Sequence, residues 1–290
     1  MVKRAQSVDE GILVDEVGIQ YGRYGPFVLK TLYQPIFRPA PEGLVPRGVE
    51  GLIKPFVAGA PVPAKSFLSQ IPDDDRLFIE CMCRALHLRN YANIGVEGLR
   101  LFFNFDPHVH DDVELTVEQI RSMANWLEDI ELPPHLLVCE ITETEAIDAE
   151  TLTRLAAEMR LHNIRLAIDD FGVGHSTLER VEMIEPDIVK IDGSWFRRIA
   201  GASPAVGLLE ALVAGLQRTG TEVLIEGIQT AGELRVALDS GADLLQGYHL
   251  ARPALAGTIF DPEPRQLAEL LGGPSNVVRL VPAEGKHKAG

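Results

Sequence analysis

Short apolar runs alternate with amphipathic helical patterns along most of the chain. Runs such as Leu99-Arg100-Leu101-Phe102-Phe103 have the length of buried strands, and the stretches between them repeat apolar residues at helical spacing. The runs predict strands near residues 27–33, 47–52, 99–105, 135–141, 164–169, 187–191, 222–226 and 243–247. The intervening patterns predict helices at 75–90, 116–130, 148–161, 204–219 and 230–240.

This order of elements favours an α/β fold, a TIM-type (β/α)₈ barrel, over two smaller domains. The first two strands depart from the pattern, because the stretch between them is rich in proline and glycine. We expect a loop there rather than a helix, and therefore an antiparallel first strand. The barrel is expected at 25–268, after a leader of unknown role at 1–24 and before a flexible tail at 269–290.

Polar side chains recur where the predicted strands end. The carboxyl ends of barrel strands converge on one face, and active sites are built there. A polar residue that interrupts a buried apolar run costs free energy unless it is paired or binds a ligand. The sequence therefore predicts one site that contains Glu50, Asn104, Glu140, Asp169, Asp170, Lys190, Asp192, Glu226 and Gln246.

The predicted ligands are carboxylate and amide oxygens, without cysteine or histidine, and such hard ligands suit Mg²⁺ or Mn²⁺ rather than Zn²⁺. The adjacent pair Asp169-Asp170 suits two ions, because one carboxylate can bridge them while its neighbour binds only the second. Two ions about 3.5–4 Å apart are the usual arrangement for in-line displacement at phosphorus.

Charge and cysteine content narrow the partners. The chain has 27 Lys and Arg against 42 Asp and Glu, a formal net charge of −15. Such a surface repels a phosphate backbone, which argues against a nucleic acid polymer as partner. Three cysteines do not suit a disulfide framework. Because neither a signal peptide nor an 18-residue apolar run is present, we expect a cytoplasmic protein without a membrane partner.

Several short motifs occur in the order and spacing of one known family. They are Tyr33-Gln34-Pro35-Ile36, Glu50-Gly51-Leu52, Asn104, Glu140-Ile141-Thr142-Glu143, Asp169-Asp170-Phe171-Gly172-Val173-Gly174, Lys190-Ile191-Asp192, Glu226-Gly227 and Gln246-Gly247-Tyr248. Over roughly residues 27–265 the chain resembles the EAL-domain phosphodiesterases, which hydrolyse cyclic di-GMP. The resemblance implies hydrolysis to linear pGpG by a water activated by two Mg²⁺ or Mn²⁺ ions.

The resemblance also implies a role for each matching residue. Lys190 would contact the attacking water, and Glu143 would steady the loop that starts at Asp170. That loop would also form a homodimer contact. The metal ligands would be Glu50, Asn104, Glu140, Asp169, Asp170 and Glu226, the last of which also completes the catalytic set. The substrate would lie against Gln34, Leu52, Lys54, Asp192 and Gln246.

Two departures from the family pattern keep a second function open. Lys54 stands where the family usually has an arginine that holds a substrate phosphate, and Gln229 stands where it has a second glutamate. Lysine keeps the charge but not the two-pronged contact. The alternative is therefore a catalytically weak cyclic di-GMP receptor that acts through a protein partner. A third reading is an unrelated metal-dependent barrel enzyme.

Overall fold

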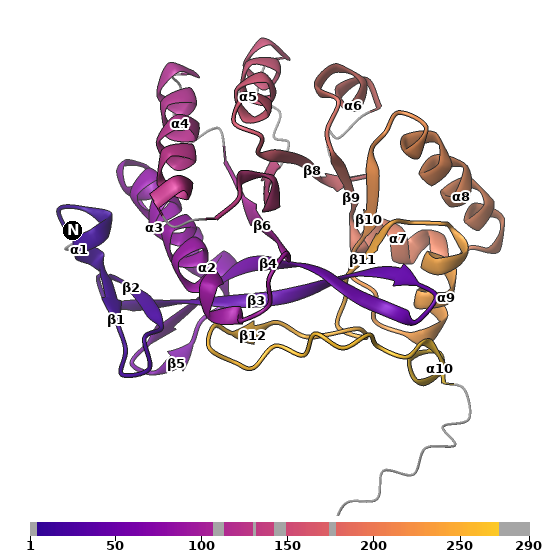
Figure 1. Cartoon of the computed structure of the whole chain (residues 1–290), viewed down its shortest axis with the longest axis horizontal. Coiled ribbons are helices and arrows are strands. Elements are labelled where there is room, and N and C mark those ends of the chain that lie inside the picture. Colours follow the sequence, from indigo (N-terminus) through magenta and orange to yellow (C-terminus); the bar gives the residue numbers. More distant parts are fainter. Residues whose placement is uncertain (1–4, 107–112, 130–131, 142–148, 174–177, 273–290) are drawn as a thin grey trace, which may run out of the picture.

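The computed structural model describes residues 5–106, 113–129, 132–141, 149–173 and 178–272 (Figure 1). The strands are β1 (Ile12–Val14), β2 (Gln20–Tyr24), β3 (Phe27–Ala40), β4 (Gly43–Val57), β5 (Ala60–Pro61), β6 (Arg100–Asn104), β7 (Leu137–Ile141), β8 (Arg165–Phe171), β9 (Ile188–Ile191), β10 (Glu222–Ile225), β11 (Leu244–Leu245) and β12 (Ala254–Leu255). The helices are α1 (Val8–Gly11), α2 (Ala64–Leu68), α3 (Asp73–Tyr91), α4 (Val113–Asp129), α5 (Ala149–Leu161), α6 (Leu178–Ile184), α7 (Gly193–Ala200), α8 (Ser203–Gln217), α9 (Ala231–Asp239) and α10 (Leu267–Leu270), with short 3-10 turns η1 (Ala92–Ile94) and η3 (Pro134–Leu136).

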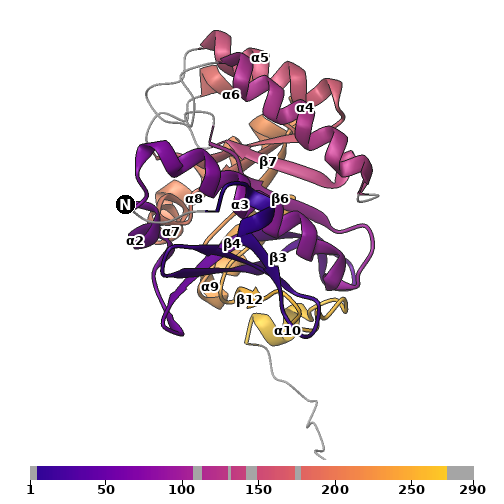
Figure 2. The ribbon, with the colours of Figure 1, turned by 90° about the vertical axis from the view of Figure 1, so that its left-hand side faces the viewer.

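Strands β3, β4 and β6 to β11 close into a barrel, because β3 pairs with β4 on one side and with β11 on the other. From β4 through β11 neighbouring barrel strands are parallel, whereas β3 is antiparallel to both of its neighbours. Helices cover the outside, with α4, α5 and α6 grouped on one side (Figure 2). The TIM-type barrel with an antiparallel first strand is confirmed.

The five predicted helices correspond to α3, α4, α5, α8 and α9, while α6 and α7 were not predicted. Local signals fix the ends of several. Helix α9 begins with a capping box, in which the Thr230 side chain accepts from the Glu233 amide and the Glu233 carboxylate accepts from the Thr230 amide. Within the described residues, no helix is both long and apolar enough to cross a membrane.

The loop predicted between the first two strands is present and no helix intervenes, but it is far shorter than predicted, since only residues 41–42 lie between β3 and β4. Strands β3 and β4 form one long hairpin joined at Ala40 and Gly43 (Figure 1). Proline was read as a strand breaker, but β4 meets its other barrel neighbour, β6, only from Gly48 onward. Pro46 therefore lies on an edge, where a missing amide donor is tolerated, and next to an irregularity of the register at Ile36.

The described part of the predicted leader extends this hairpin as further strands. β2 pairs with β3, and β1 pairs with β2, both antiparallel. A separate apolar cluster fixes the extension to α2 and α3; it consists of Ile12, Tyr24, Leu29, Phe67, Ile71, Phe78, Ile79, Met82 and Leu86. The sheet is thus continuous from residue 12 into the barrel.

Alternation of side chains along each barrel strand separates an outer core from an inner one. In β6, Leu101 and Phe103 pack toward the helices, whereas Phe102 between them points into the barrel. The inner core, here called the apolar layer, consists of Ile36, Phe102, Val138, Ala167, Ile188, Leu224 and Leu244. Side chains two or four residues from this layer on the same strands therefore point into one of the two barrel ends.

Gly51 is required by its neighbour on α3. A Cβ at residue 51 would lie 2.8 Å from Cγ of His87, a distance at which one of the two must move. His87 has little room to do so, since its imidazole is buried and Nδ1 lies 3.1 Å from Oγ1 of Thr31. Burial lowers the pKa of His87 to about 3, so the ring is neutral at physiological pH.

We predict that Gly51→Ala lowers the free energy of unfolding by about 1–3 kcal/mol, the usual cost of overpacking. Equilibrium unfolding in urea measures it. The same change at Gly207, which is exposed on α8 with open space around it, should stabilise by about 0.5–1 kcal/mol because alanine is the better helix former. In a His87→Ala background most of the Gly51→Ala cost should vanish; an equal cost in both backgrounds would disprove the steric explanation.

Candidate active site

One ammonium group lies among four carboxylates at the carboxyl end of the barrel. Lys190 of β9 is 1% exposed, and its Nζ lies 2.6 Å from Oε1 of Glu140, 2.8 Å from Oε1 of Glu226 and 3.1 Å from Oδ1 of Asp169. Oε1 of Glu50 is 3.8 Å away. These five side chains, here called the Lys190 cluster, come from β4, β7, β8, β9 and the residue after β10.

The strand register explains why these residues meet. Glu140 and Lys190 each follow the apolar layer by two residues on β7 and β9. Asp169 and Glu226 follow it by two residues on β8 and β10. Because these strands run parallel, residues two positions after the apolar layer on each strand point into the same end of the barrel interior, and all four side chains therefore meet there.

Burial and mutual charge dominate the electrostatics of the cluster. Burial alone would lower the pKa of Lys190, but the surrounding carboxylates outweigh it and raise that pKa well above its ordinary value. Burial raises the pKa of Glu140, partly opposed by Lys190. Burial also raises the pKa of Glu226 to about 8, again against the attraction of Lys190. Lys190 is therefore charged, and the carboxyl groups of Glu140 and Glu226 hold protons more tightly than an ordinary glutamate does.

Three of the predicted site residues differ in the groups that they hydrogen-bond: Gln34, Asp192 and Gln246. Gln246 donates from Nε2 to Oε2 of Glu50 at 2.8 Å and so orients a cluster member. Gln34 pairs with Glu50 across the β3–β4 hairpin and donates to the carbonyl of Ala251 at 3.4 Å. Asp192 caps α7, accepting from the Trp195 amide at 2.8 Å. Of these three side chains, Gln246 is the one that hydrogen-bonds a member of the cluster within the described residues.

The remaining predicted residues lie around the rim or on the hairpin. Asn104 ends β6, is exposed, and is the register partner of Glu140. Asp170 has a φ of 55°, a conformation rare for residues other than glycine. Burial and the neighbouring Asp169 raise its pKa. Leu52 and Lys54 lie half-buried on β4 beyond Glu50, while Glu143 and loop residues 174–177 fall outside the described residues.

No pattern in the sequence indicated two residues that position the backbone next to Glu226. Arg197 was missed; its Nη1 donates to the carbonyl of Gly227 at 2.9 Å and fixes the turn after Glu226. Gly193 was missed as well; it must be a glycine because a Cβ there would lie 2.8 Å from Cα of Gly227.

Gln229 lies outside the cluster: it is exposed, and its amide donates to Oε2 of Glu233 at 2.6 Å.

The donor set suits a hard divalent cation. Oε2 of Glu140 is buried without a hydrogen-bond partner, so an acceptor of the cluster is left unsatisfied. All the nearby candidates are carboxylate or amide oxygens, which Mg²⁺, Mn²⁺ and Ca²⁺ prefer. The described residues contain no group of three or more His, Cys, Asp or Glu side chains already arranged to hold a metal, since the carboxylates surround Lys190.

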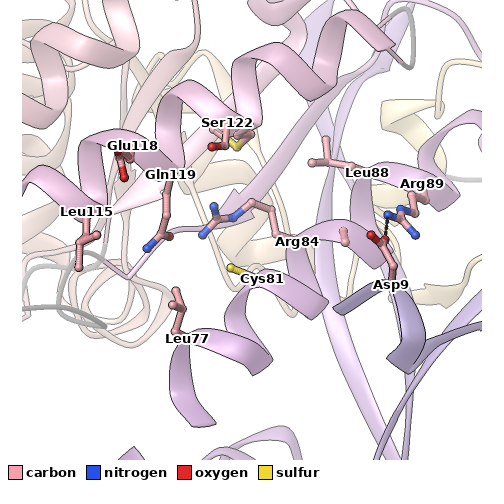
Figure 3. A pocket seen from close by; sticks show the side chains of 12 residues that line it. Asp9, Leu77, Cys81, Arg84, Leu88, Arg89, Leu115, Glu118, Gln119 and Ser122 are labelled. Atoms are coloured by element: carbon pink, nitrogen blue, oxygen red, sulfur yellow. Dashed lines mark hydrogen bonds and ion pairs between the residues drawn. The ribbon is translucent and has the colours of Figure 1, made fainter. Parts of the chain in front are cut away.

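A separate groove of about 450 Å³ lies on the outside of the barrel between α3 and α4 (Figure 3). Arg84 and Gln119 line it, and none of its lining residues belongs to the Lys190 cluster. The Arg84 guanidinium contacts Glu80 at 2.7 Å and lies 4.8 Å above the Phe105 ring. The groove wall thus packs against the outer side of the strand end that carries Asn104.

The profile of the EAL domain matches residues 29–253. The chain belongs to the EAL domain family. Within it, the probable cyclic di-GMP phosphodiesterase PdeD of Escherichia coli (strain K12) is 35% identical over 121 residues, 42% of this chain and 23% of PdeD. The cyclic di-GMP phosphodiesterase RocR of Pseudomonas aeruginosa is 30% identical over 185 residues, 62% of this chain and 45% of RocR.

Among solved structures, this EAL domain is similar to the Bacillus subtilis YkuI protein, with an EAL domain, in complex with substrate c-di-GMP and calcium. The TM-score is 0.70 at 25% identity, over 81% of this chain and 57% of YkuI. The chain spans less than half the length of PdeD and RocR. These matches establish the family and the fold.

We predict that Lys190→Met lowers the free energy of unfolding by about 3–5 kcal/mol in EDTA, because it leaves buried carboxylates without their cation. Chemical denaturation measures this loss. Lys65→Met is the matched control; Lys65 is exposed on α2, and its replacement should change stability by no more than about 0.5 kcal/mol. Equal stability of the two variants would show that the ammonium does not hold the cluster together.

Proposed function

We propose that this EAL domain is a metal-dependent phosphodiesterase that hydrolyses cyclic di-GMP to linear pGpG. The observation that carries the proposal is the Lys190 cluster, an ammonium and four carboxylates at the catalytic end of a barrel. The names of PdeD and RocR, and the substrate and calcium bound to YkuI, support the choice of substrate and of a divalent ion.

Glu50, Asn104, Glu140, Asp169, Asp170 and Glu226 would hold two Mg²⁺ or Mn²⁺ ions. When bound, such ions supply Lewis acidity and offset the negative charge of the phosphodiester. Lys190 would orient the attacking water and stabilise charge that develops on phosphoryl oxygen, for which its buried, permanently charged ammonium is suited. The water oxygen forms the new bond to phosphorus, the bond to the ribose 3′ oxygen breaks, and that oxygen takes up a proton.

Substrate binding would involve residues outside the Lys190 cluster. Lys54 and Leu52 lie on β4 beyond Glu50, and Gln34 lies opposite Glu50 on β3. Asp192 and Gln246 lie at the ends of β9 and β11 on the same barrel face. We propose that Lys54 pairs with a substrate phosphate, with less geometric specificity than arginine provides. Glu143 would steady the loop that starts at Asp170, and this loop would also serve a homodimer contact.

A cyclic di-GMP receptor that acts through a protein partner is the second candidate. Gln229 and Lys54 favour it, because the family usually has Glu and Arg at these positions. Against it, Gln229 is exposed and its amide belongs to the cap of α9, apart from the Lys190 cluster. The loss of its charge therefore leaves the proposed ligands and Lys190 in place.

Asp169→Asn is predicted to reduce turnover by at least about 10²-fold, the scale expected when one electrostatic contact to the reacting group is lost. The neutral side chain keeps the shape of the ligand but not its charge. Chromatography of cyclic di-GMP and pGpG across a Mg²⁺ titration measures the effect, and circular dichroism should show an unchanged fold. Asp239→Asn, an exposed position on α9, is the control. Near-normal turnover of Asp169→Asn at limiting Mg²⁺ would contradict the metal assignment.

Gln229→Glu decides between enzyme and receptor. The wild-type protein should hydrolyse cyclic di-GMP, and the variant should change the rate by less than ~30-fold, about 2 kcal/mol in barrier height. The reason is that residue 229 lies outside the Lys190 cluster. A receptor would bind cyclic di-GMP yet show no turnover in Mg²⁺ or Mn²⁺, and would gain activity only as Gln229→Glu. That pattern would replace the enzyme proposal by the receptor.

A further inference from the structure

The opposite, amino-terminal end of the barrel carries a concentration of arginines. Arg100 and Arg165 are the first residues of β6 and β8, and Glu222 is the first residue of β10. The Glu222 carboxylate pairs with Arg100 and with Arg38 of β3, while Nη1 of Arg165 lies 3.9 Å from it. Together with Arg47 of β4, these residues are here called the arginine cluster.

Arg47 is directed to this end by an irregularity in the hairpin. Ile36 pairs with Gly48, but Phe37 pairs with Pro46, so Arg47 has no partner in the register. A bulge of this kind re-aims a side chain, and bulges recur beside functional sites. Arg47 is close enough to the other arginines that, after the effect of burial, their charges lower its pKa.

The cluster has more positive charge than its own carboxylate can balance. Three guanidinium groups, those of Arg38, Arg100 and Arg165, share Glu222, and within the described part of the chain no ion pair joins Arg47 to a carboxylate. Two other acids at this end, Asp187 and Asp243, are engaged by the backbone amides of Leu166 and Val223. Guanidinium groups held this close together repel one another, and a bound anion would relieve that repulsion.

The exposed fractions of the four arginine side chains suit an anion site, because one side chain is buried and held in place while the others can be reached from solvent. The Arg100 side chain is 7% exposed and held by Glu222. Arg38 and Arg165 are 37% and 33% exposed, and Arg47 is exposed. Nε of Arg165 donates to the His135 carbonyl at 3.1 Å, which fixes the direction of its guanidinium. Pre-organised guanidinium groups offer the paired donors that match phosphate oxygens.

We propose that the arginine cluster binds the phosphate group of a small phosphorylated molecule at the end of the barrel opposite the Lys190 cluster. The apolar layer separates the two ends. Four strand residues, about 13 Å, separate Arg100 from Asn104 and Arg165 from Asp169. A ligand here therefore does not compete for the proposed metal ligands.

Calorimetric titration with inorganic pyrophosphate in EDTA and at low ionic strength tests the proposal, because EDTA excludes binding through metal ions. The wild-type chain should bind, and Arg47→Gln and Arg165→Gln should each weaken the Kd at least about tenfold, as expected when a hydrogen bond to a charged group is lost. Arg235→Gln, an exposed change of the same kind on α9, should alter the Kd by no more than about twofold. No binding by the wild-type chain, or equal weakening in all three variants, would overturn the proposal.

Thermal unfolding separates a ligand site from a purely structural network. Without phosphate, Arg47→Gln should keep or raise the melting temperature, because it removes a repelled charge; with pyrophosphate it should lose the stabilisation seen in the wild-type chain. An Arg47→Gln variant that is less stable than the wild-type chain without phosphate, and is stabilised by pyrophosphate to the same extent, would overturn the proposal.

Titration with AMP separates a nucleotide site from a site for the phosphate group alone. If AMP binds more tightly than pyrophosphate and this advantage is lost in Arg47→Gln, the site is assigned to a nucleotide. If AMP binds equally or more weakly, the site is assigned to the phosphate group alone. Adenosine that binds as well as AMP would overturn the proposal.

Discussion

A closed eight-stranded barrel leaves interior space only for the side chains of alternate residues, and the rest of this structure depends on how that space is filled. The apolar layer occupies the middle of the interior. On some strands it leaves a polar position at each end. On β8 these positions are Arg165 and Asp169, and at β10 they are Glu222, its first residue, and Glu226, which directly follows it. The same strand geometry thus assembles the Lys190 cluster at one end and the arginine cluster at the other, and the apolar layer keeps them apart.

The two clusters satisfy their charges in opposite ways. At the carboxyl end, one ammonium is shared by several carboxylates, so further cations are favoured. At the amino end, one carboxylate is shared by several guanidinium groups, so anions are favoured. Burial strengthens this tendency at the Lys190 cluster, because charges in a low-dielectric interior interact more strongly than at a wet surface, whereas the arginine cluster is partly open to solvent. Lys190 and Glu222 are therefore organising residues: each fixes the positions of the like-charged groups that would otherwise separate.

The sequence could predict the features that depend on a short local pattern, but not those that depend on contacts between segments distant along the chain. The parallel strands were predictable because each is a short apolar run ended by a polar residue, and the convergence of Glu140, Asp169 and Glu226 follows from parallel pairing alone. The antiparallel pairing of β3 and β4 was predicted as well, but the full length of their hairpin was not, because Pro46 signals a break unless its position on an edge is known. The contact between Gly51 and His87 joins a strand to a helix distant in sequence, and only the packing shows why alanine does not fit. Arg47 was expected as the first residue of the strand at 47–52, and only the register, in which it has no partner, shows that it belongs to the barrel end.

The two departures from the family pattern, Lys54 and Gln229, lie outside the Lys190 cluster, and their position determines which step of the proposed reaction they can affect. Lys54 is on the hairpin beyond the last β4 residue that pairs with β6, and Gln229 is at the start of α9. Among the described residues, the ion pairs of Lys190 are with Glu50, Glu140, Asp169 and Glu226, and residues 54 and 229 belong to neither side of them. Groups that hold a substrate at a distance from the reacting atoms act on ground state and transition state alike, whereas groups at the reacting phosphorus act on the barrier. Lysine at position 54 should therefore raise KM more than it lowers kcat, because the contacts proposed to stabilise the transition state belong to residues that this chain retains.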